Sequence, residues 1–173
     1  DGVSRPIIMD ATVEQAGIVE PGAYRFIYVL PLSPHDLFIE DTYYADRPEL
    51  DESILSARID AYCAIHGWQG EWIASETGVL PVITGGDFAA FQQDHRIEGV
   101  GRAGALGGFV HPLTSYSMPQ AVDTALFVAA NAGRSGHELA ELLERRARNH
   151  WRATRFYRLL GQMLFGAARP EER

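Results

Sequence analysis

The sequence predicts an α+β fold in which a mainly antiparallel sheet comes first and helices follow. Three β-rich stretches lie early in the chain and are joined by short connections, which favours antiparallel neighbours. Apolar residues at helical spacing then prevail in the second half. With 173 residues, 46% of them hydrophobic, the chain is long enough to bury a core.

The predicted strands are stretches of β-branched and aromatic residues bounded by turn residues. They are expected at residues 7–13, 24–30, 37–44, 68–75 and 79–84. Pro21–Gly22 marks the turn before the second strand, and residues 31–36 supply two prolines, a serine and an aspartate before the third.

The predicted helices begin with Asp51, an N-cap residue followed by apolar positions at helical spacing as far as Ile65. This helix should cover the sheet and end at His66–Gly67. Residues 99–108 are glycine-rich, which suits a strand end and a loop close to a ligand. Further helices are expected over 121–132 and, as a long final helix, over 138–164.

Charge is distributed unevenly in a chain whose formal net charge is −8. Residues 1–133 carry 6 Arg and 18 acids, a net charge of −12, whereas residues 134–173 carry 9 Arg and 5 acids, a net charge of +4. An acidic bulk without a groove-reading motif argues against nucleic-acid binding. The basic final helix, which carries Arg145, Arg146, Arg148 and Arg152 near Trp151, indicates either an anionic surface such as a membrane or a packed, solvated helix.

The compartment is expected to be the cytoplasm. Cys63 is the single cysteine, so no internal disulfide can form, and the first residues lack the pattern of a secretory signal. No uncharged apolar run reaches 18 residues, so any membrane contact should be peripheral. The six histidines lack metal-ligand spacing, and no metal site is predicted.

Two adjacent carboxylates lie inside the third predicted strand, in Phe38-Ile39-Glu40-Asp41-Thr42. Side chains alternate along a strand, so Glu40 shares a face with Phe38 and Thr42 while Asp41 points to the other face. A carboxyl group buried among apolar groups has a raised pKa and holds a proton that it can donate. Alternatively, the two acids lie at a solvent-facing edge or pair with Arg25 on the neighbouring strand.

A second motif spans residues 107–119, where two glycines lead to His111, Pro112 and a proline-preceded helix. Glycines let a backbone approach a cofactor closely, and the amides at a helix N-terminus favour negative charge. His111 fits a proton relay or a cofactor contact, or a turn residue whose ring is already hydrogen-bonded.

Residues 24–33, 38–42 and 107–112 together resemble the flavin-dependent lycopene cyclases of carotenoid-making bacteria. The resemblance implies that Glu40 is the acid–base residue of a proton-initiated, redox-neutral cyclisation of lycopene end groups to β-ionone rings, as in β-carotene. It also implies reduced FAD as an electrostatic cofactor. The substrate would be an apolar carotenoid taken up at a membrane surface.

The resemblance also implies a set of binding residues. Flavin contacts are expected from Gly107, Gly108, His111, Pro112, Tyr116 and Ser117, and substrate contacts from Tyr24, Phe26, Tyr28, Phe38 and Thr42. The aromatic face of Tyr24, Phe26 and Tyr28 is either core or the border of a carotenoid tunnel. Leu113 and Ser115 stand where the family pattern has Thr and Gly.

The family pattern covers the chain as a fragment, since we find no counterpart of the family's dinucleotide-binding half, in which Gly-x-Gly-x-x-Gly follows a first strand. We expect a substrate-binding sheet domain over 1–98, a segment of an FAD-binding fold resembling p-hydroxybenzoate hydroxylase over 99–133, and a basic helical segment over 134–173. Such a fragment should bind no flavin and be inactive. Other readings are an FAD-dependent monooxygenase or isoprenoid reductase, or a non-enzymatic binder of apolar ligands.

Overall fold

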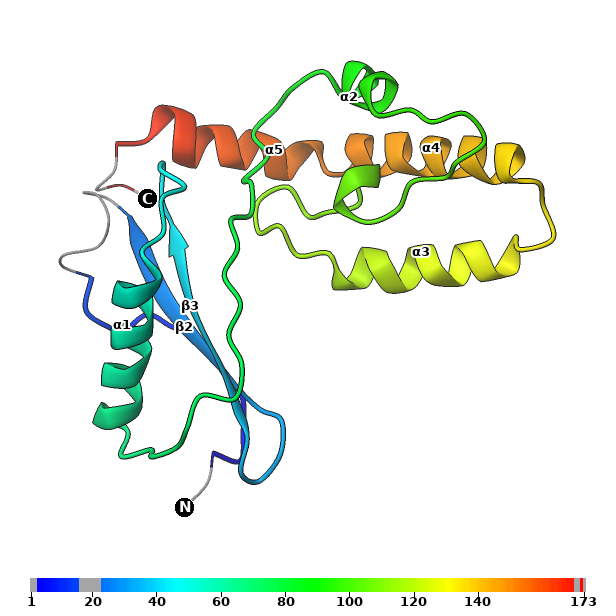
Figure 1. Ribbon diagram of the computed structural model, residues 1–173. Helices are drawn as coiled ribbons and strands as arrows, with labels where there is room; N and C mark the ends of the chain where they lie inside the picture. Colours follow the sequence, from blue (N-terminus) through cyan, green and yellow to red (C-terminus); the bar gives the residue numbers. More distant parts are fainter. Residues whose placement is uncertain (1–2, 16–22, 170–171, 173) are drawn as a thin grey trace. The chain divides into compact units, whose positions relative to one another are not determined.

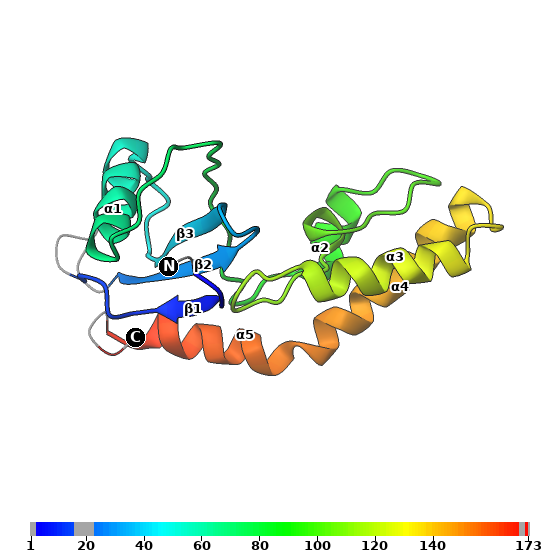
Figure 2. The same cartoon turned by 90° about the horizontal axis from the view of Figure 1, so that it is seen from below.

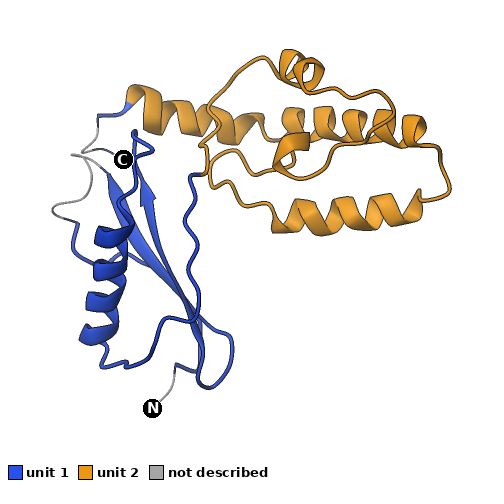
Figure 3. Cartoon of the chain, in the orientation of Figure 1, with its two compact units in different colours: residues 1–79, 168–173 blue, residues 80–167 orange. Residues whose placement is uncertain are grey.

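The computed structural model describes residues 3–15, 23–169 and 172. It divides into two compact units, residues 1–79 with 168–173 and residues 80–167 (Figure 3). The first unit holds an antiparallel sheet and one helix, and the second is helical, so the α+β class is confirmed. The predicted functional divisions at residues 98 and 133 stay predictions.

Three strands form the sheet of the first unit, in the order β1 (Ile7–Asp10), β2 (Tyr24–Pro31) and β3 (Leu37–Tyr44). Figure 1 labels β2 and β3, and Figure 2 shows all three strands side by side. Both pairings are antiparallel, and β2 and β3 stay in register from Tyr24 opposite Tyr44 to Pro31 opposite Leu37. The short connection is closed by Asp36, whose carbonyl oxygen accepts from the Leu32 amide at 2.9 Å. Residues 31–36 therefore form the turn that the sequence predicts.

Helix α1 (Glu52–Ile65) covers one face of this sheet (Figure 2). Its Tyr62 packs with Ile27 and Val29, both fully buried, to form the core of the unit. Asp51 caps the helix by accepting from the amides of Ser53 and Ile54, and the helix ends before Gly67, whose φ is +70°. The predicted boundaries are confirmed.

A hydrogen bond ties α1 to β1. The Tyr62 hydroxyl donates to Asp10 Oδ2 at 2.8 Å, and the Thr12 hydroxyl and amide donate to Asp10 Oδ1 at 2.6 and 3.0 Å. The Thr12 hydrogen bond, against a smaller effect of burial and with help from Tyr62, holds the pKa of Asp10 below its ordinary value. Burial, together with Asp10, raises the pKa of Tyr62.

The second unit consists of helices around a small apolar core. In chain order they are α2 (Phe88–Asp94), the short 3₁₀ helix η1 (Ala105–Gly107), α3 (Met118–Ala130), α4 (Gly136–Ala153), α5 (Arg155–Gly161) and the π-helix η2 (Gln162–Ala167). Phe109, Leu143 and Ala147 are buried together, with Phe88 and Phe127 packed against them. Ser135 and Glu138 form a capping box at the start of α4.

The expectation of one continuous final helix is wrong, because the helix is interrupted at Thr154. Its hydroxyl lies 2.9 Å from the His150 carbonyl oxygen and accepts from Arg158 Nη1 at 2.9 Å. Side chains that bond back to a carbonyl one turn earlier compete with the helix ladder. Trp151, one turn before the interruption, stacks on Phe88 at 4.8 Å and carries the Arg158 guanidinium at 3.6 Å from its ring centroid.

Two of the predicted strands are also absent from the described residues. Residues 68–75 and 79–84 form no ladder, although the Ile83 amide donates to the Pro112 carbonyl oxygen at 2.7 Å. Alternating side chains favour a strand only where a partner strand completes the hydrogen bonds. Helix α3 begins three residues earlier than expected because Pro119 is tolerated in a first turn, whereas α2 was not anticipated. The turn at Pro21–Gly22 lies outside the described residues.

We expect Asp10→Asn to destabilise the chain in a pH-dependent way. Because the folded state lowers the pKa of Asp10, its stabilising contribution is complete above the ordinary aspartate value of about 4 and is lost as the pH falls through the lower folded-state value. In urea unfolding, the free energy of unfolding of Asp10→Asn should therefore be lower than that of the unchanged chain at pH 7, and this difference should become smaller toward pH 2. Asp94→Asn, at an exposed helix end, is the control. A gap that stays constant with pH would contradict the assignment.

Candidate functional site

The predicted substrate residues lie on one face of the β2–β3 pair, opposite the face that α1 covers. Glu40 stands across from Tyr28, Thr42 across from Phe26, and Phe38 across from Leu30. Residues paired across a ladder have Cβ atoms about 4.5–5.5 Å apart, which brings these side chains into one array. The structure therefore brings together Tyr24, Phe26, Tyr28, Phe38 and Thr42 around Glu40.

Aromatic rings form most of this face. Phe26 is buried, and its ring centroid lies 5.8 Å from that of Tyr24, 5.4 Å from that of Tyr28 and 5.9 Å from that of Tyr44. The Phe26 and Tyr28 rings meet edge to face. Tyr28, which pairs with Glu40 across the ladder, belongs to this aromatic group. Aromatic rings favour a positive charge over their faces.

Glu40 itself is exposed, so the expectation that this carboxyl is buried is wrong for the unit as it stands. Helix α1 packs on the opposite face, and the Glu40 side chain is reached by the Thr42 hydroxyl, which donates to Oε1 at 2.7 Å. This hydrogen bond restrains the Glu40 carboxylate, and no hydrogen bond to its second oxygen is recorded among the described residues.

Asp41 points to the covered face and forms a buried ion pair with Arg25. Arg25 Nε and Nη2 donate to the two carboxylate oxygens at 2.8 and 3.1 Å, and the side chains are 7% and 1% exposed. The Tyr43 hydroxyl donates to Asp41 Oδ2 at 2.6 Å and accepts from Arg58 Nη1 at 3.0 Å. Of the two alternatives for these acids, the solvent-facing position holds for Glu40 and the Arg25 pair for Asp41.

The electrostatics of this network follow from burial and from the ion pair. Burial by itself disfavours the charged Arg25, but hydrogen bonding to Asp41 and its charge outweigh that penalty and raise the pKa of Arg25. Burial and the hydrogen bond to Asp41 raise the pKa of Tyr43. Arg25 thus stays charged and Tyr43 stays neutral, which leaves Asp41 a structural group and Glu40 the carboxylate available for chemistry.

The predicted flavin residues lie in the second unit, where the two glycines serve packing. A Cβ on Gly107 would lie 2.8 Å from the Arg102 carbonyl oxygen, and one on Gly108 would lie 2.6 Å from a Phe88 ring carbon. Gly108 also has a φ of +82°. Both glycines therefore permit a close approach to the protein's own backbone and to Phe88, and their predicted contact with a flavin stays a prediction.

The loop after the glycines folds tightly on itself. The His111 amide donates to the Tyr116 carbonyl oxygen at 2.9 Å, and the Ser115 amide donates to the His111 carbonyl oxygen at 2.8 Å. Ser115 has a φ of +57°, which explains a glycine in the family pattern, and its hydroxyl donates to the Pro81 carbonyl oxygen at 2.5 Å. Serine is therefore accommodated by a hydrogen bond that glycine lacks.

His111 has a hydrogen-bonded ring. Its Nδ1 accepts from the Thr114 amide at 3.3 Å, so the neutral ring carries its proton on Nε2, and its centroid lies 4.3 Å from that of Tyr157. Burial, with a smaller effect of His150, lowers the pKa of His111. The His111 ring is therefore neutral at pH 7. This agrees with the alternative in which His111 is a turn residue whose ring is already hydrogen-bonded.

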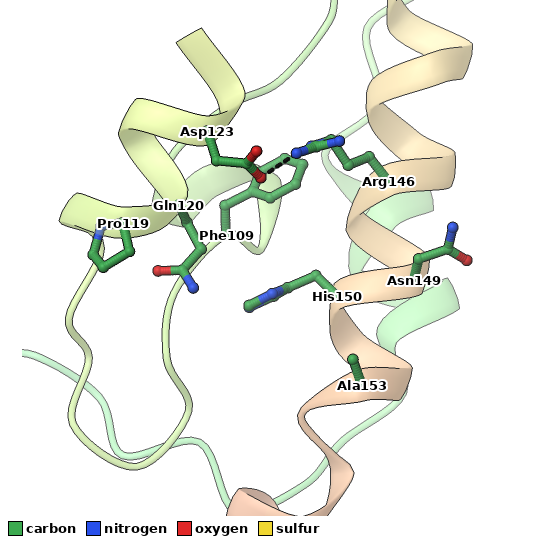
Figure 4. Close-up of a pocket in the computed structure, with 8 residues that line it drawn as sticks. All are labelled: Phe109, Pro119, Gln120, Asp123, Arg146, Asn149, His150 and Ala153. Carbon is green, nitrogen blue, oxygen red and sulfur yellow. Dashed lines mark hydrogen bonds and ion pairs between the residues drawn. The ribbon is translucent and has the colours of Figure 1, made fainter. Parts of the chain in front are cut away.

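A pocket of about 540 Å³ opens between α3 and α4, next to this loop (Figure 4). Its lining is polar except for Phe109, Pro119 and Ala153 and includes Gln120, Asp123, Arg146, Asn149 and His150. Arg146 pairs with Asp123, and His150 Nε2 donates to the Val110 carbonyl oxygen at 2.8 Å. Gln120 Oε1 is buried without a hydrogen-bond partner in the described part of the chain.

The α3 N-terminus borders this pocket and lacks a side-chain cap. Ser117 precedes the helix but accepts no hydrogen bond from its first turn, and Pro119 and Gln120 line the pocket. Sequence reasoning reached Ser117 and Tyr116 but missed Gln120, Asn149 and His150, because α3 and α4 are brought together only by folding. Three or more histidine, cysteine, aspartate or glutamate side chains do not converge anywhere in the described residues.

Asp41→Asn should destabilise the chain strongly, because it leaves Arg25 buried without a counter-charge. Breaking one partner of a buried pair typically costs about 3–5 kcal/mol. The control, Glu40→Gln, changes the neighbouring carboxylate on the exposed face and should stay within about 0.5 kcal/mol of the unchanged chain. Urea unfolding measures both. Similar losses for the two variants would show that Asp41 does not anchor the strand pair.

Comparison with known proteins places the whole chain in one family. Residues 2–173 match the family model described as lycopene cyclase protein. The chain is 42% identical over 173 residues to lycopene beta-cyclases of Pseudescherichia vulneris and of Paracoccus sp. (strain N81106 / MBIC 01143), and 38% identical to that of Pantoea ananas.

Each alignment covers 99% of this chain but 43% of the relative, so the chain spans less than half the length of the curated relatives it matches. No solved structure matches it significantly. The Glu40 strand, the loop after Gly108 and the helices that follow all fall within the matched residues, and the chain belongs to the lycopene cyclase family.

Proposed function

We propose that the whole protein cyclises the end groups of lycopene to β-ionone rings, with Glu40 as the general acid. The observation that carries the proposal is the position of Glu40, the only carboxylate that β2 and β3 place on the aromatic sheet face. Asp41, its neighbour, is bound to Arg25 and unavailable. Named lycopene beta-cyclases that match the entire chain support the same assignment.

The proposed reaction takes up one proton, releases one proton and is redox-neutral. A protonated Glu40 gives its proton to the terminal C1=C2 bond of the polyene, which leaves a tertiary cation. The C5=C6 bond then attacks C1 to close the ring, and loss of a proton from C6 forms the β-ring. Tyr28, Phe26 and Tyr44 lie on the same sheet face as Glu40, and an aromatic ring stabilises a cation over its face by about 0.5–2 kcal/mol per contact.

Substrate binding would give the exposed Glu40 carboxylate the apolar, water-free surroundings that it lacks in this structure. A polyene laid along the aromatic face displaces water from Glu40, and desolvation disfavours the charged carboxylate and favours the protonated acid. The Thr42 hydroxyl keeps Glu40 on this face while water leaves. Protonation is thereby coupled to the presence of the substrate.

The second unit fits a role in holding FAD, which in this family would supply negative charge from its reduced form to stabilise the cation. Pro119 and Gln120, in the uncapped first turn of α3, line the pocket, and the buried Gln120 Oε1 has no hydrogen-bond partner among the described residues. Free helix amides match the phosphate and carbonyl groups of a flavin nucleotide, and the Gln120 Oε1 acceptor matches an N–H or hydroxyl donor of the nucleotide. His111, Pro112, Tyr116, Ser117 and Gln120 are the residues that we propose to hold it.

Glu40→Gln in the whole protein should abolish most of the conversion of lycopene to β-carotene. General acid–base groups contribute about 10²–10⁴-fold to a rate, and glutamine keeps the shape of the side chain without its proton. Pigment extracted from lycopene-producing cells measures the effect. Glu49→Gln, the same change at an exposed position outside the sheet, should leave the product unchanged.

Thr42→Val should lower the conversion less than Glu40→Gln, since it removes the hydroxyl that orients Glu40 and leaves the acid in place. Near-normal β-carotene from the Glu40→Gln protein, present at normal abundance, would remove Glu40 from the reaction. Oxidation of NADPH in step with product would instead favour the reductase or monooxygenase alternative.

The isolated 173-residue chain should purify without flavin, whereas the whole protein should bind FAD. The residues proposed to hold the cofactor form one side of a site, and a partly enclosed nucleotide loses most of its burial and hence its affinity. Absorbance near the flavin bands after gel filtration measures retention. In the whole protein, Gln120→Leu should weaken FAD binding while urea unfolding stays near that of the unchanged protein. Unchanged FAD affinity would place the cofactor elsewhere.

A further inference from the structure

Helices α5 and η2 expose an apolar row on their outward side. Phe156, Leu159 and Met163 are 66%, 54% and 57% exposed. Spacings of three and four residues put them on one face of the helix, and Arg152 and Arg155, both exposed, extend the same face toward α4. We call these five residues the α5 outer face.

The opposite side of the same helical segment packs against other residues of the second unit. Arg158 is buried, lies over Trp151 and donates to Thr154, while Trp151 stacks on Phe88. The aromatic that sequence reasoning placed at an anionic surface, Trp151, therefore belongs to the interior of the unit. What remains outward is Phe156, Leu159 and Met163, which ordinary burial would have turned inward.

Charge around this face has one sign. Residues 145–158 contain six arginines and no acid, within a chain whose net charge is −8. Three of the six are engaged: Arg146 with Asp123 and the Phe127 ring, Arg148 with Glu144 and Gln92, and Arg158 with Trp151. For Arg145, Arg152 and Arg155 the described residues record no ion pair.

We propose that the α5 outer face seats the protein on an anionic lipid surface. The inference rests on the proposed function, since lycopene reaches an enzyme from lipid. Of the arginines expected from sequence it keeps Arg152, and it extends the contact to α5. Apolar residues enter the headgroup boundary while arginine stems lie along it and their guanidinium groups reach lipid phosphates. In the described chain no helix is long and apolar enough to cross a bilayer, which fits a contact of this shallow kind.

Co-sedimentation with vesicles tests the proposal without an activity assay. The whole protein and the 173-residue chain are each mixed with phosphatidylglycerol–phosphatidylcholine vesicles and with pure phosphatidylcholine vesicles. Binding to the anionic vesicles should weaken about 30-fold in Arg152→Gln/Arg155→Gln, from about 1 kcal/mol per arginine near the surface. Phe156→Ser/Leu159→Ser/Met163→Ser should weaken it at least about 10-fold.

Two control variants test whether the loss of vesicle binding is specific to the α5 outer face. Met118→Ser/Val122→Ser/Leu126→Ser removes an equally exposed apolar row from α3, and Arg5→Gln/Arg47→Gln removes two arginines from the first unit. Both should bind anionic vesicles within about twofold of the unchanged protein.

Three outcomes would overturn the proposal. The first is equal loss in the control variants, and the second is binding that the α5 variants and high salt leave unchanged. The third is binding by the isolated chain that disappears in the whole protein, which would mean that another part of the protein covers this face. Cyclisation that fails while vesicle binding behaves as expected would count against Glu40 chemistry and leave the lipid contact standing.

Discussion

The buried pair of Arg25 and Asp41 is the interaction on which the candidate site depends. It joins β2 and β3 on the face that α1 covers, where the side chains are 7% and 1% exposed. A slip of one residue in the register would exchange the faces of Glu40 and Asp41 and would break the two hydrogen bonds that Arg25 donates to Asp41. The pair thus selects the register that presents Glu40 on the aromatic face.

The two faces of the β2–β3 pair therefore carry carboxylates in different environments. The covered face holds charge that is fully paired and hydrogen-bonded, with Tyr43 and Arg58 completing the network around Asp41. The other face holds a carboxylate oriented by Thr42 and surrounded by rings. The proposed reaction needs a carboxyl that can change its charge, and the second environment would permit that change when a polyene displaces water, as we propose.

The helical unit is organised around Trp151, held between Phe88 and Arg158. Arg158 is engaged in this packing, and Arg146 and Arg148 form ion pairs. Among the arginines of residues 145–158, those without an ion pair recorded in the described residues and outside this packing are Arg145, Arg152 and Arg155. The interruption at Thr154 sets the direction of α5 and with it the exposure of Phe156, Leu159 and Met163. Helix packing thereby separates the arginines that stabilise the unit from those proposed to meet lipid.

Local pattern determined the three antiparallel strands, the Asp51-capped helix and the opposite orientation of Glu40 and Asp41, because each depends on the period of a single element and on its turn residues. The family motif added a role for Glu40 that pattern alone leaves open. Tertiary structure decided that Asp41 is paired, that Glu40 is exposed, that Gly107 and Gly108 pack against Arg102 and Phe88, and that residues 68–75 find no strand partner. These outcomes depend on which distant residues come within a few ångströms, and the pocket of Gln120 and His150 exists for that reason alone.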